Sequence, residues 1–540
     1  MPHQDDGSSQ GRNTTPRIRR DAAPDVRRRR RPWLIAAAAI LMVVFSAPPL
    51  VNLVRDAPNK DYSLWHQVGV AVRDGVEIYP DPDSHRLFPF MYPPSAAALL
   101  GYVSYLGRYG TGILLVLVHS AAWVGAVLLS VRLATGRATG SRPALYVVPS
   151  LVIVALIHNT YLLGQPNLSL LTLLLAAFFC LQKGRDVAAG ALVATGAAIK
   201  AFPILALGYL IYRRRWKASA ATVAALAAWL LIVPLPFRTP AQAARDVHVW
   251  SDGMLFTYNK QGIAQRPYRS YSYKNQSIMA MTHRLLRDVP ADGEAVLSKR
   301  VAAYRRAHKN DETDGVRADG SFDLKTMLAT APWETGRIAA AFEGIDADLK
   351  KAWRVNVASL DFRAVTLATL AAMAVLGLFT LAVLPGGRDR TQRSDALEFS
   401  IITLLIVMFS PLSFNYAYVW LIFPATVALN EAFAHPSPSR RGRIAERAWL
   451  AFILLLPATA VAAPLYAQAY GNLFVPSALL VFTLGARLKR VGRRTEPEAS
   501  GERDDARRET AAAESAAASP YSEPSRERRQ GKWRDKLDSC

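Results

Sequence analysis

The sequence is poor in cysteine, with only two among its 540 residues, Cys180 and Cys540. Cys180 lies in an apolar run and Cys540 is the last residue, so we predict neither a disulfide framework nor a cysteine metal site. The sequence also has no Walker loop, zinc motif or hydrolase elbow. These absences argue against the enzyme classes that use those motifs, and we expect no metal and no cofactor.

Long apolar runs, in contrast, are abundant. Hydrophobic residues make up 51% of the chain, and runs such as Leu34–Val54, Gly112–Leu133 and Val365–Leu384 are long enough to cross a bilayer. The sequence therefore predicts an all-α polytopic membrane protein with about 11–13 transmembrane helices. The middle spans show no acidic relay, which argues against a proton-coupled transporter.

Basic residues outnumber acidic ones, and the net charge is +23. They cluster at the ends of apolar runs and in both tails, as the positive-inside rule predicts for cytoplasmic segments, so we expect no nucleic-acid partner. Residues 1–32 are predicted to be a disordered cytoplasmic head before a signal anchor. Residues 491–540 are predicted to be a disordered cytoplasmic tail. Both termini are then cytoplasmic in a multi-pass protein of the cell membrane.

The same charge asymmetry divides the transmembrane domain, residues 33–490, into inner and outer parts. The first loop (54–94) and a partly helical insert (237–363) are predicted to be extracytoplasmic. Ser95–Leu106 is short, and we expect a re-entrant or interfacial helix there. Ala188–Tyr212 is predicted to form a hairpin with Lys200 near its outer turn, because Pro203 favours a break.

Polar and aromatic residues from distant parts of the chain fall on the predicted outer side. For any one of them, exposure to water explains the position, and the first loop by itself fits a solvated loop with an aromatic belt equally well. A lysine within an apolar hairpin, however, normally needs a partner. The candidates are Asp61, Tyr62, Tyr92, Gln165, Asn167, Lys200, Asn275, Gln276, Ser410 and Asn415.

This combination suits sugar transfer. A carboxylate accepts a proton from a sugar hydroxyl, and a lysine holds a lipid-linked phosphate and stabilises the departing anion. Tyrosine, asparagine and glutamine side chains bind a hexose. We therefore expect Asp61 to be catalytic and Lys200 to bind the donor phosphate, with help from a basic residue of the insert. The other eight candidates are expected to bind substrate.

The order of the motifs resembles glycosyltransferase family 87 over residues 34–490. The shared pattern is Asp61-Tyr62, Gly75…Tyr79, Tyr92-Pro93-Pro94, Gly164-Gln165-x-Asn167, Lys200-x-x-Pro203, Asn275-Gln276-Ser277 and Ser410-Pro411-x-Ser413. The resemblance implies a GT-C fold and inverting transfer of mannose from polyprenyl phosphate to a glycolipid or glycan acceptor of the cell envelope, without a nucleotide donor. Asp61 matches the aspartate proposed as the general base of that family.

One departure from the family pattern concerns the acceptor. Many members carry one or two histidines just after the Ser-Pro-x-Ser motif, where this chain has Asn415 and Tyr416. A different acceptor contact or a divergent branch of the family explains the change. Two other functions stay open: a transporter or flippase of lipid-linked sugars, and a non-catalytic scaffold for envelope assembly. An enzyme needs Asp61 at the mouth of a cavity, whereas a transporter needs a polar path through the bilayer.

Overall fold

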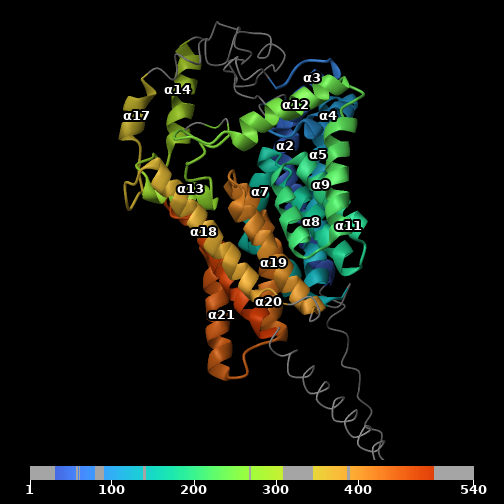
Figure 1. The fold of residues 1–540 in the computed structure, drawn as a ribbon, viewed down its shortest axis with the longest axis vertical. Coiled ribbons are helices and arrows are strands. Elements are labelled where there is room, and N and C mark those ends of the chain that lie inside the picture. Colours follow the sequence, from blue (N-terminus) through green and yellow to red (C-terminus); the bar gives the residue numbers. More distant parts are fainter. Residues whose placement is uncertain are drawn as a thin grey trace, which may run out of the picture.

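The fold is all-helical, as predicted (Figure 1). A computed structural model describes residues 31–55, 57, 59, 61–79, 90–137, 141–264, 266, 269–307, 344–385 and 390–491. Within these ranges the β-structure is limited to two isolated bridges, Tyr258 with Ile263 and Asn275 with Phe414. The predicted cytoplasmic head and tail lie almost wholly outside the described residues.

Five helical segments of the described chain are long and apolar enough to cross a membrane. They are Ile35–Val54 in α2 (Arg31–Val54), Pro94–Thr135 in α4 and α5, Phe362–Val383 (α18), Asn415–Ala434 in η7 and α20, and Arg440–Ala462 in α21 and its extension. A sixth is the pair α6 (Ala144–Val152) and α7 (Val154–Leu163), which is bent by 66°. The polytopic class is therefore confirmed.

Several other apolar runs form shorter helices. They are α8 (Asn167–Gln182), α9 (Asp186–Ile199), η3 with α10 (Phe202–Tyr212), and α11 with η4 (Trp216–Ile232). The predicted number of spans, 11–13, is larger than the number of described helices that are long enough to cross a membrane. The difference arises because breaks divide these apolar runs into shorter helices. Ser95–Leu106 forms α4 (Pro94–Val103) and η2 (Ser104–Leu106), and Gly107, with φ of 70°, separates them from the rest of α5 (Gly107–Thr135). Its re-entrant or interfacial placement stays a prediction.

The hairpin predicted around Lys200 is present as a break between helices. α9 ends at Ile199, Lys200 is extended with φ of −155° and ψ of 123°, and Pro203 lies in the 3₁₀ turn that leads into α10 (Ala206–Tyr212). α9 also packs very closely on α11, where a Cβ added at Gly190 would meet the Ala218 carbonyl oxygen at 2.2 Å. Small residues on both helices permit this approach.

The remaining helices include α3 (Asp61–Arg73), α19 (Gln392–Phe409), η7 (Asn415–Leu421), α20 (Ile422–Ala434), α21 (Arg440–Leu455) and α23 (Pro464–Ala469). The insert is partly helical, as predicted, with α12 (Pro240–Ser251), α13 (Ile278–Leu286), α14 (Gly293–Ala307) and α17 (Ile345–Lys351) in its described part. In Figure 1, α3, α12 and α14 lie toward one end of the molecule and the lower part of α21 toward the other.

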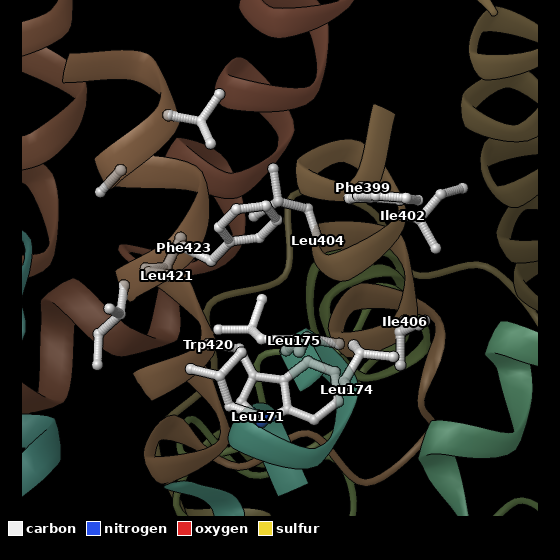
Figure 2. Close-up of a cluster of buried hydrophobic side chains, with 14 of the residues drawn as sticks. Leu171, Leu174, Leu175, Phe399, Ile402, Leu404, Ile406, Trp420, Leu421 and Phe423 are labelled. Atoms are coloured by element: carbon white, nitrogen blue, oxygen red, sulfur yellow. The ribbon is translucent and has the colours of Figure 1, made fainter. Parts of the chain in front are cut away.

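The largest apolar cluster is built around α8. Leu171, Leu174 and Leu175 of this helix are at most 1% exposed and lie beside Trp420 of η7 and Ile406 of α19 (Figure 2). Because lipid tails are as apolar as leucine, close van der Waals packing, rather than the hydrophobic effect, stabilises such a core within a bilayer. The core therefore fixes the first residues of α8 and of η7 relative to one another.

Buried ion pairs hold the end of the bundle that is rich in basic residues. Arg213, after α10, donates from Nε to Glu398 of α19 at 2.6 Å, and Glu398 is fully buried. Arg393 donates from Nε to Glu431 at 2.9 Å. Gln392 donates to the Leu133 carbonyl at 3.1 Å. The ends of α5, α10, α19 and α20 are therefore together, as the alternating charge pattern predicts.

Candidate active site

The candidate site forms where α3, the α7–α8 turn, the α9–α10 break and η7 meet. Asp61 is the first residue of α3, where the helix dipole favours a negative charge. The Tyr62 hydroxyl donates to the Tyr161 carbonyl at 2.8 Å, and Trp65 Nε1 donates to the Gly164 carbonyl at 3.0 Å. These two bonds hold α3 against the α7–α8 turn.

The α7–α8 turn places the side chain of Gln165. Gly164 ends α7 in the left-handed region with φ of 71°, and a Cβ there would lie 3.1 Å from the Tyr62 ring. This geometry explains the glycine of the Gly164-Gln165-x-Asn167 motif, because other residues disfavour positive φ. The turn directs the Gln165 amide toward Asp61 and Lys200.

Gln165 bonds both charged residues of the site. Its Nε2 donates to Asp61 Oδ2, and its Oε1 accepts from the Tyr92 hydroxyl at 2.9 Å and from Lys200 Nζ at 3.5 Å. Because an ionised carboxylate only accepts hydrogen bonds and an ammonium only donates them, this amide orientation satisfies all three partners. Asp61 and Lys200 are thus joined through one amide group.

Lys200 is enclosed by aromatic rings. Its Nζ lies 5.5 Å from the centroids of the Tyr92 and Tyr416 rings and 5.8 Å from that of Phe202, distances at which cation–π attraction is effective. It also donates to Asn167 Oδ1 at 3.4 Å. Lys200 lies in the turn between helices, where burial lowers its pKa to about 8 and the charge of Asp61 opposes that decrease.

The end of the first loop forms one wall of this site. Tyr92 packs against Trp65 and Phe90, with ring centroids 4.7 and 5.3 Å away. Its carbonyl accepts from the Tyr79 hydroxyl at 2.6 Å. These aromatic residues pack against α3 and α4, so this part of the loop is ordered by packing. Residues 80–89 lie outside the described chain.

The other predicted substrate-binding residues form a neighbouring group. The Asn275 side chain donates to the Ser270 and Pro411 carbonyls at 2.8 and 2.9 Å, the Gln276 backbone donates to the Ser413 carbonyl at 2.8 Å, and Asn415 Nδ2 faces Gln468 Oε1 at 3.3 Å. Ser410 is 4% exposed and ends α19. These contacts join the insert to the turn before Tyr416. A role in binding substrate stays a prediction for all four.

Arg284 holds the segment that contains Asn275 in place, and no sequence motif identifies this arginine. It is fully buried in α13 and donates to the carbonyls of Ser272, Asn275 and Ala469 at 2.7, 3.0 and 3.0 Å. Burial lowers its pKa to about 9. Nothing in its local sequence distinguishes it from a solvated arginine, because its partners are backbone atoms.

The arrangement defines a class of protein. A helical membrane domain carries, at one end, a carboxylate and an ammonium group bridged by an amide and lined by aromatic rings, which suits a sugar next to an anionic group. Among the described residues, no three or more histidine, cysteine or acidic side chains are placed to hold a metal ion.

Comparison with known proteins matches one family over part of the chain. The family model for Glycosyltransferase family 87 matches residues 90–307, which confirms the resemblance that the motifs predict. The matched range includes Tyr92, Gln165 and Lys200, whereas Asp61 and Asn415 lie outside it.

A curated relative agrees with this match. Over 148 residues the chain is 32% identical to the polyprenol-phosphate-mannose-dependent alpha-(1-2)-phosphatidylinositol pentamannoside mannosyltransferase of Mycobacterium tuberculosis (strain CDC 1551 / Oshkosh). The aligned part is 27% of this chain and 33% of that protein, so the chain spans about a third of the length of this relative. No solved structure matches the chain significantly.

Proposed function

We propose that this protein is a membrane glycosyltransferase that moves mannose from a polyprenyl-phosphate donor to a lipid-linked or glycan acceptor outside the cytoplasm. The observation that carries the proposal is the bridge through Gln165, which joins Asp61 to Lys200 within one aromatic site. The family match supports the transferase class, and the name of the relative supports the donor.

The proposed reaction needs one base and one cation. The acceptor hydroxyl is a weak nucleophile, and Asp61 takes its proton as the acceptor oxygen attacks the anomeric carbon. A positioned general base contributes about 10²–10⁴-fold. The electron pair of the broken bond stays on the phosphate oxygen, where the charge of Lys200 stabilises it. Attack opposite the leaving phosphate inverts the anomeric centre.

The rings of Tyr92 and Tyr416 have a second role in this proposal. Both lie 5.5 Å from Lys200 Nζ and are half-buried, so they border the place where the phosphate would bind. Aromatic faces pack well against the apolar face of a hexose and exclude water. Exclusion of water favours transfer to the acceptor over hydrolysis of the donor.

The decisive test is a transfer assay with the full-length protein in lipid vesicles, polyprenyl-phosphate mannose and extracted glycolipid acceptors. Wild-type protein is expected to form a mannosylated product, and Asp61→Asn to lose at least about 10²-fold in kcat while it still binds donor. Asp74→Asn is the matched control, because Asp74 is exposed just after α3 and pairs with Arg73 at 3.6 Å.

The outcomes separate the mechanism from the activity. Product formation by Asp61→Asn at the wild-type rate would show that another group is the base, and Asp81→Asn and Asp83→Asn then test two further acids of the loop. Absence of product from wild-type protein with every lipid acceptor would contradict the proposed function itself.

A further inference from the structure

We propose that Arg266 is a second phosphate-binding residue, which forms with Lys200 a two-cation site for the lipid phosphate that leaves during transfer. This inference rests on the proposed function and names the residue of the insert that completes its donor site.

Arg266 comes from the insert but reaches the wall of the site. Its guanidinium Nε lies against the Met91 thioether, and the next residue is Tyr92, whose ring centroid is 5.5 Å from Lys200 Nζ. Trp250 Nε1 donates to the Met91 carbonyl at 3.1 Å and holds this segment from the side of α12. The two cations therefore flank adjacent residues of one ordered segment.

The backbone around Arg266 is fixed. The fully buried Ser270 accepts from the Ile263 backbone at 2.9 Å, and its hydroxyl lies 2.7 Å from the Arg266 carbonyl. Ala264 has φ of 53°, in a region that costs an L-residue about 1–2 kcal/mol. Such strain persists only where the surrounding contacts impose it, and it is concentrated at functional sites.

The charges near Arg266 and Lys200 do not balance. Lys200 donates to the amide oxygens of Gln165 and Asn167, Arg266 lies against Met91, and these two cations stand near the single carboxylate of Asp61. Burial is the main cause that lowers the pKa of Lys200; Asp61 opposes this decrease, and Arg266 adds to it. Two half-buried positive charges repel each other unless an anion lies between them. A bound phosphate supplies that anion.

The charge that develops during transfer would be stabilised further by a second cation at this place. The donor is a phosphodiester with one negative charge. When the bond between the anomeric carbon and the phosphate oxygen breaks, its electron pair stays on that oxygen, and the phosphate becomes a monoester with up to two charges. The new bond joins the acceptor oxygen to the anomeric carbon, and the hydroxyl proton passes to Asp61. Negative charge therefore increases on the phosphate while the Asp61 carboxylate becomes neutral.

Two cations therefore favour the leaving group over the donor. A cation fixed beside the phosphate stabilises the negative charge that develops there in the transition state and so lowers the activation barrier. Loss of one such group costs about 10²–10³-fold in kcat. Arg266 is accordingly expected to affect kcat more than donor KM. It is also expected to strengthen inhibition by the product, free polyprenyl phosphate.

The test uses full-length protein in lipid vesicles and compares Arg266→Gln and Arg266→Lys with wild type. Arg266→Gln is expected to lose about 10²-fold in kcat with a smaller change in donor KM, and to be inhibited at least tenfold more weakly by polyprenyl phosphate. Arg266→Lys keeps the charge and is expected to recover most of both losses. Arg245→Gln is the control, because Arg245 lies on α12 of the same insert and pairs with Glu77.

A measurement on wild-type protein supplements the variants. Polyprenyl phosphate is expected to bind at least tenfold more tightly than its methyl ester, which carries only one charge. The two-cation site would be overturned if the two lipids bound equally well. It would also be overturned if Arg266→Gln folded and kept the wild-type kcat and product inhibition. In either case, product formation by wild-type protein would still support the proposed function. Wild-type protein that binds polyprenyl phosphate but forms no product would contradict the function and leave the phosphate site standing.

Discussion

Gln165 determines how Asp61 and Lys200 can function side by side. A direct ion pair between the two would neutralise both and leave the carboxylate a weak proton acceptor and the ammonium occupied. The amide of Gln165 instead donates to Asp61 and accepts from Lys200 and Tyr92. The amide therefore fixes the position of both charged groups without a direct ion pair between them.

Lys200→Ala is expected to raise the donor KM and to lower kcat/KM by about 10²-fold, because it removes the charge that stabilises the phosphate. Lys200→Arg keeps the charge and is expected to retain more activity. The measurement is kcat/KM for the donor at fixed acceptor, with apparent melting temperatures to verify folding. Unchanged donor kinetics in Lys200→Ala would show that the lysine only anchors the hairpin.

The lysine pKa also predicts a pH dependence. Because the pKa of Lys200 is lowered to about 8, the ammonium form dominates below that pH and is lost above it. Wild-type kcat/KM is therefore expected to decrease as pH rises through about 8. In Lys200→Arg this decrease should disappear, since arginine stays charged over the whole range. A decrease of equal size in both proteins would assign it to another group.

At the scale of elements, one hydrogen-bonded chain joins the insert to α18. Arg287 donates to His283 Nδ1 at 3.0 Å, so the ring proton is on Nε2, which lies 2.6 Å from the Tyr258 hydroxyl. That hydroxyl reaches Thr366 of α18 at 2.9 Å. This chain requires a neutral imidazole, and it fixes the insert that carries Asn275 and Arg266.

This chain predicts that the insert is less stable in acid. Burial, followed by the charge of Arg287, lowers the pKa of His283 from 6.5 to about 3. Below about pH 6.5 the His283 imidazole is therefore protonated in the unfolded state but not in the folded state. The folded state loses stability as pH falls below that value. The apparent melting temperature is expected to be lower at pH 5 than at pH 7.5. In His283→Gln, which keeps both hydrogen bonds without titrating, the difference should shrink.

The opposite end of the bundle depends on Glu398. This fully buried carboxylate accepts from Arg213 and from the Tyr209 hydroxyl, and Arg390 lies 3.8 Å away. Glu398→Gln removes the anion that pairs with Arg213, while Arg390 keeps its pair with Asp395, and breaking a buried pair costs about 3–5 kcal/mol. We expect a clear decrease in apparent melting temperature. Asp186→Asn is the control, because its pair with Arg215 is partly exposed and such pairs contribute about 0–1 kcal/mol.

The sequence predicts these elements better than it predicts their contacts. The break at Lys200 and Pro203 and the partly helical insert follow from proline and charge patterns, and the structure has both. The bond between Gln165 and Asp61 joins residues 104 positions apart, and no local pattern specifies it. The roles of Arg266 and Arg284 could not be predicted from the sequence, because their contacts depend on backbone geometry and packing rather than on a motif.

At the scale of the whole molecule, the two ends differ in chemistry. Arg213, Arg390, Arg393 and their acidic partners gather at one end, whereas Asp61 and Lys200 lie where the other ends of α9 and α19 meet η7. The positive-inside rule predicts that the first end lies in the cytoplasm. On that prediction the site faces the outside, which is the side on which the proposed function needs its lipid-linked donor.

Cysteine labelling tests this orientation. In a background of Cys180→Ser and Cys540→Ser, Lys260→Cys reports on the insert and Lys217→Cys on the basic end, and both positions are exposed. A membrane-impermeant maleimide applied to intact cells without their wall is expected to label Lys260→Cys but not Lys217→Cys, and permeabilised cells should show both. Labelling of Lys217→Cys alone would place Asp61 and Lys200 at the cytoplasmic face. The lipid-linked donor would then have to reach the site from the cytoplasm, and the orientation predicted from the charge asymmetry would be wrong.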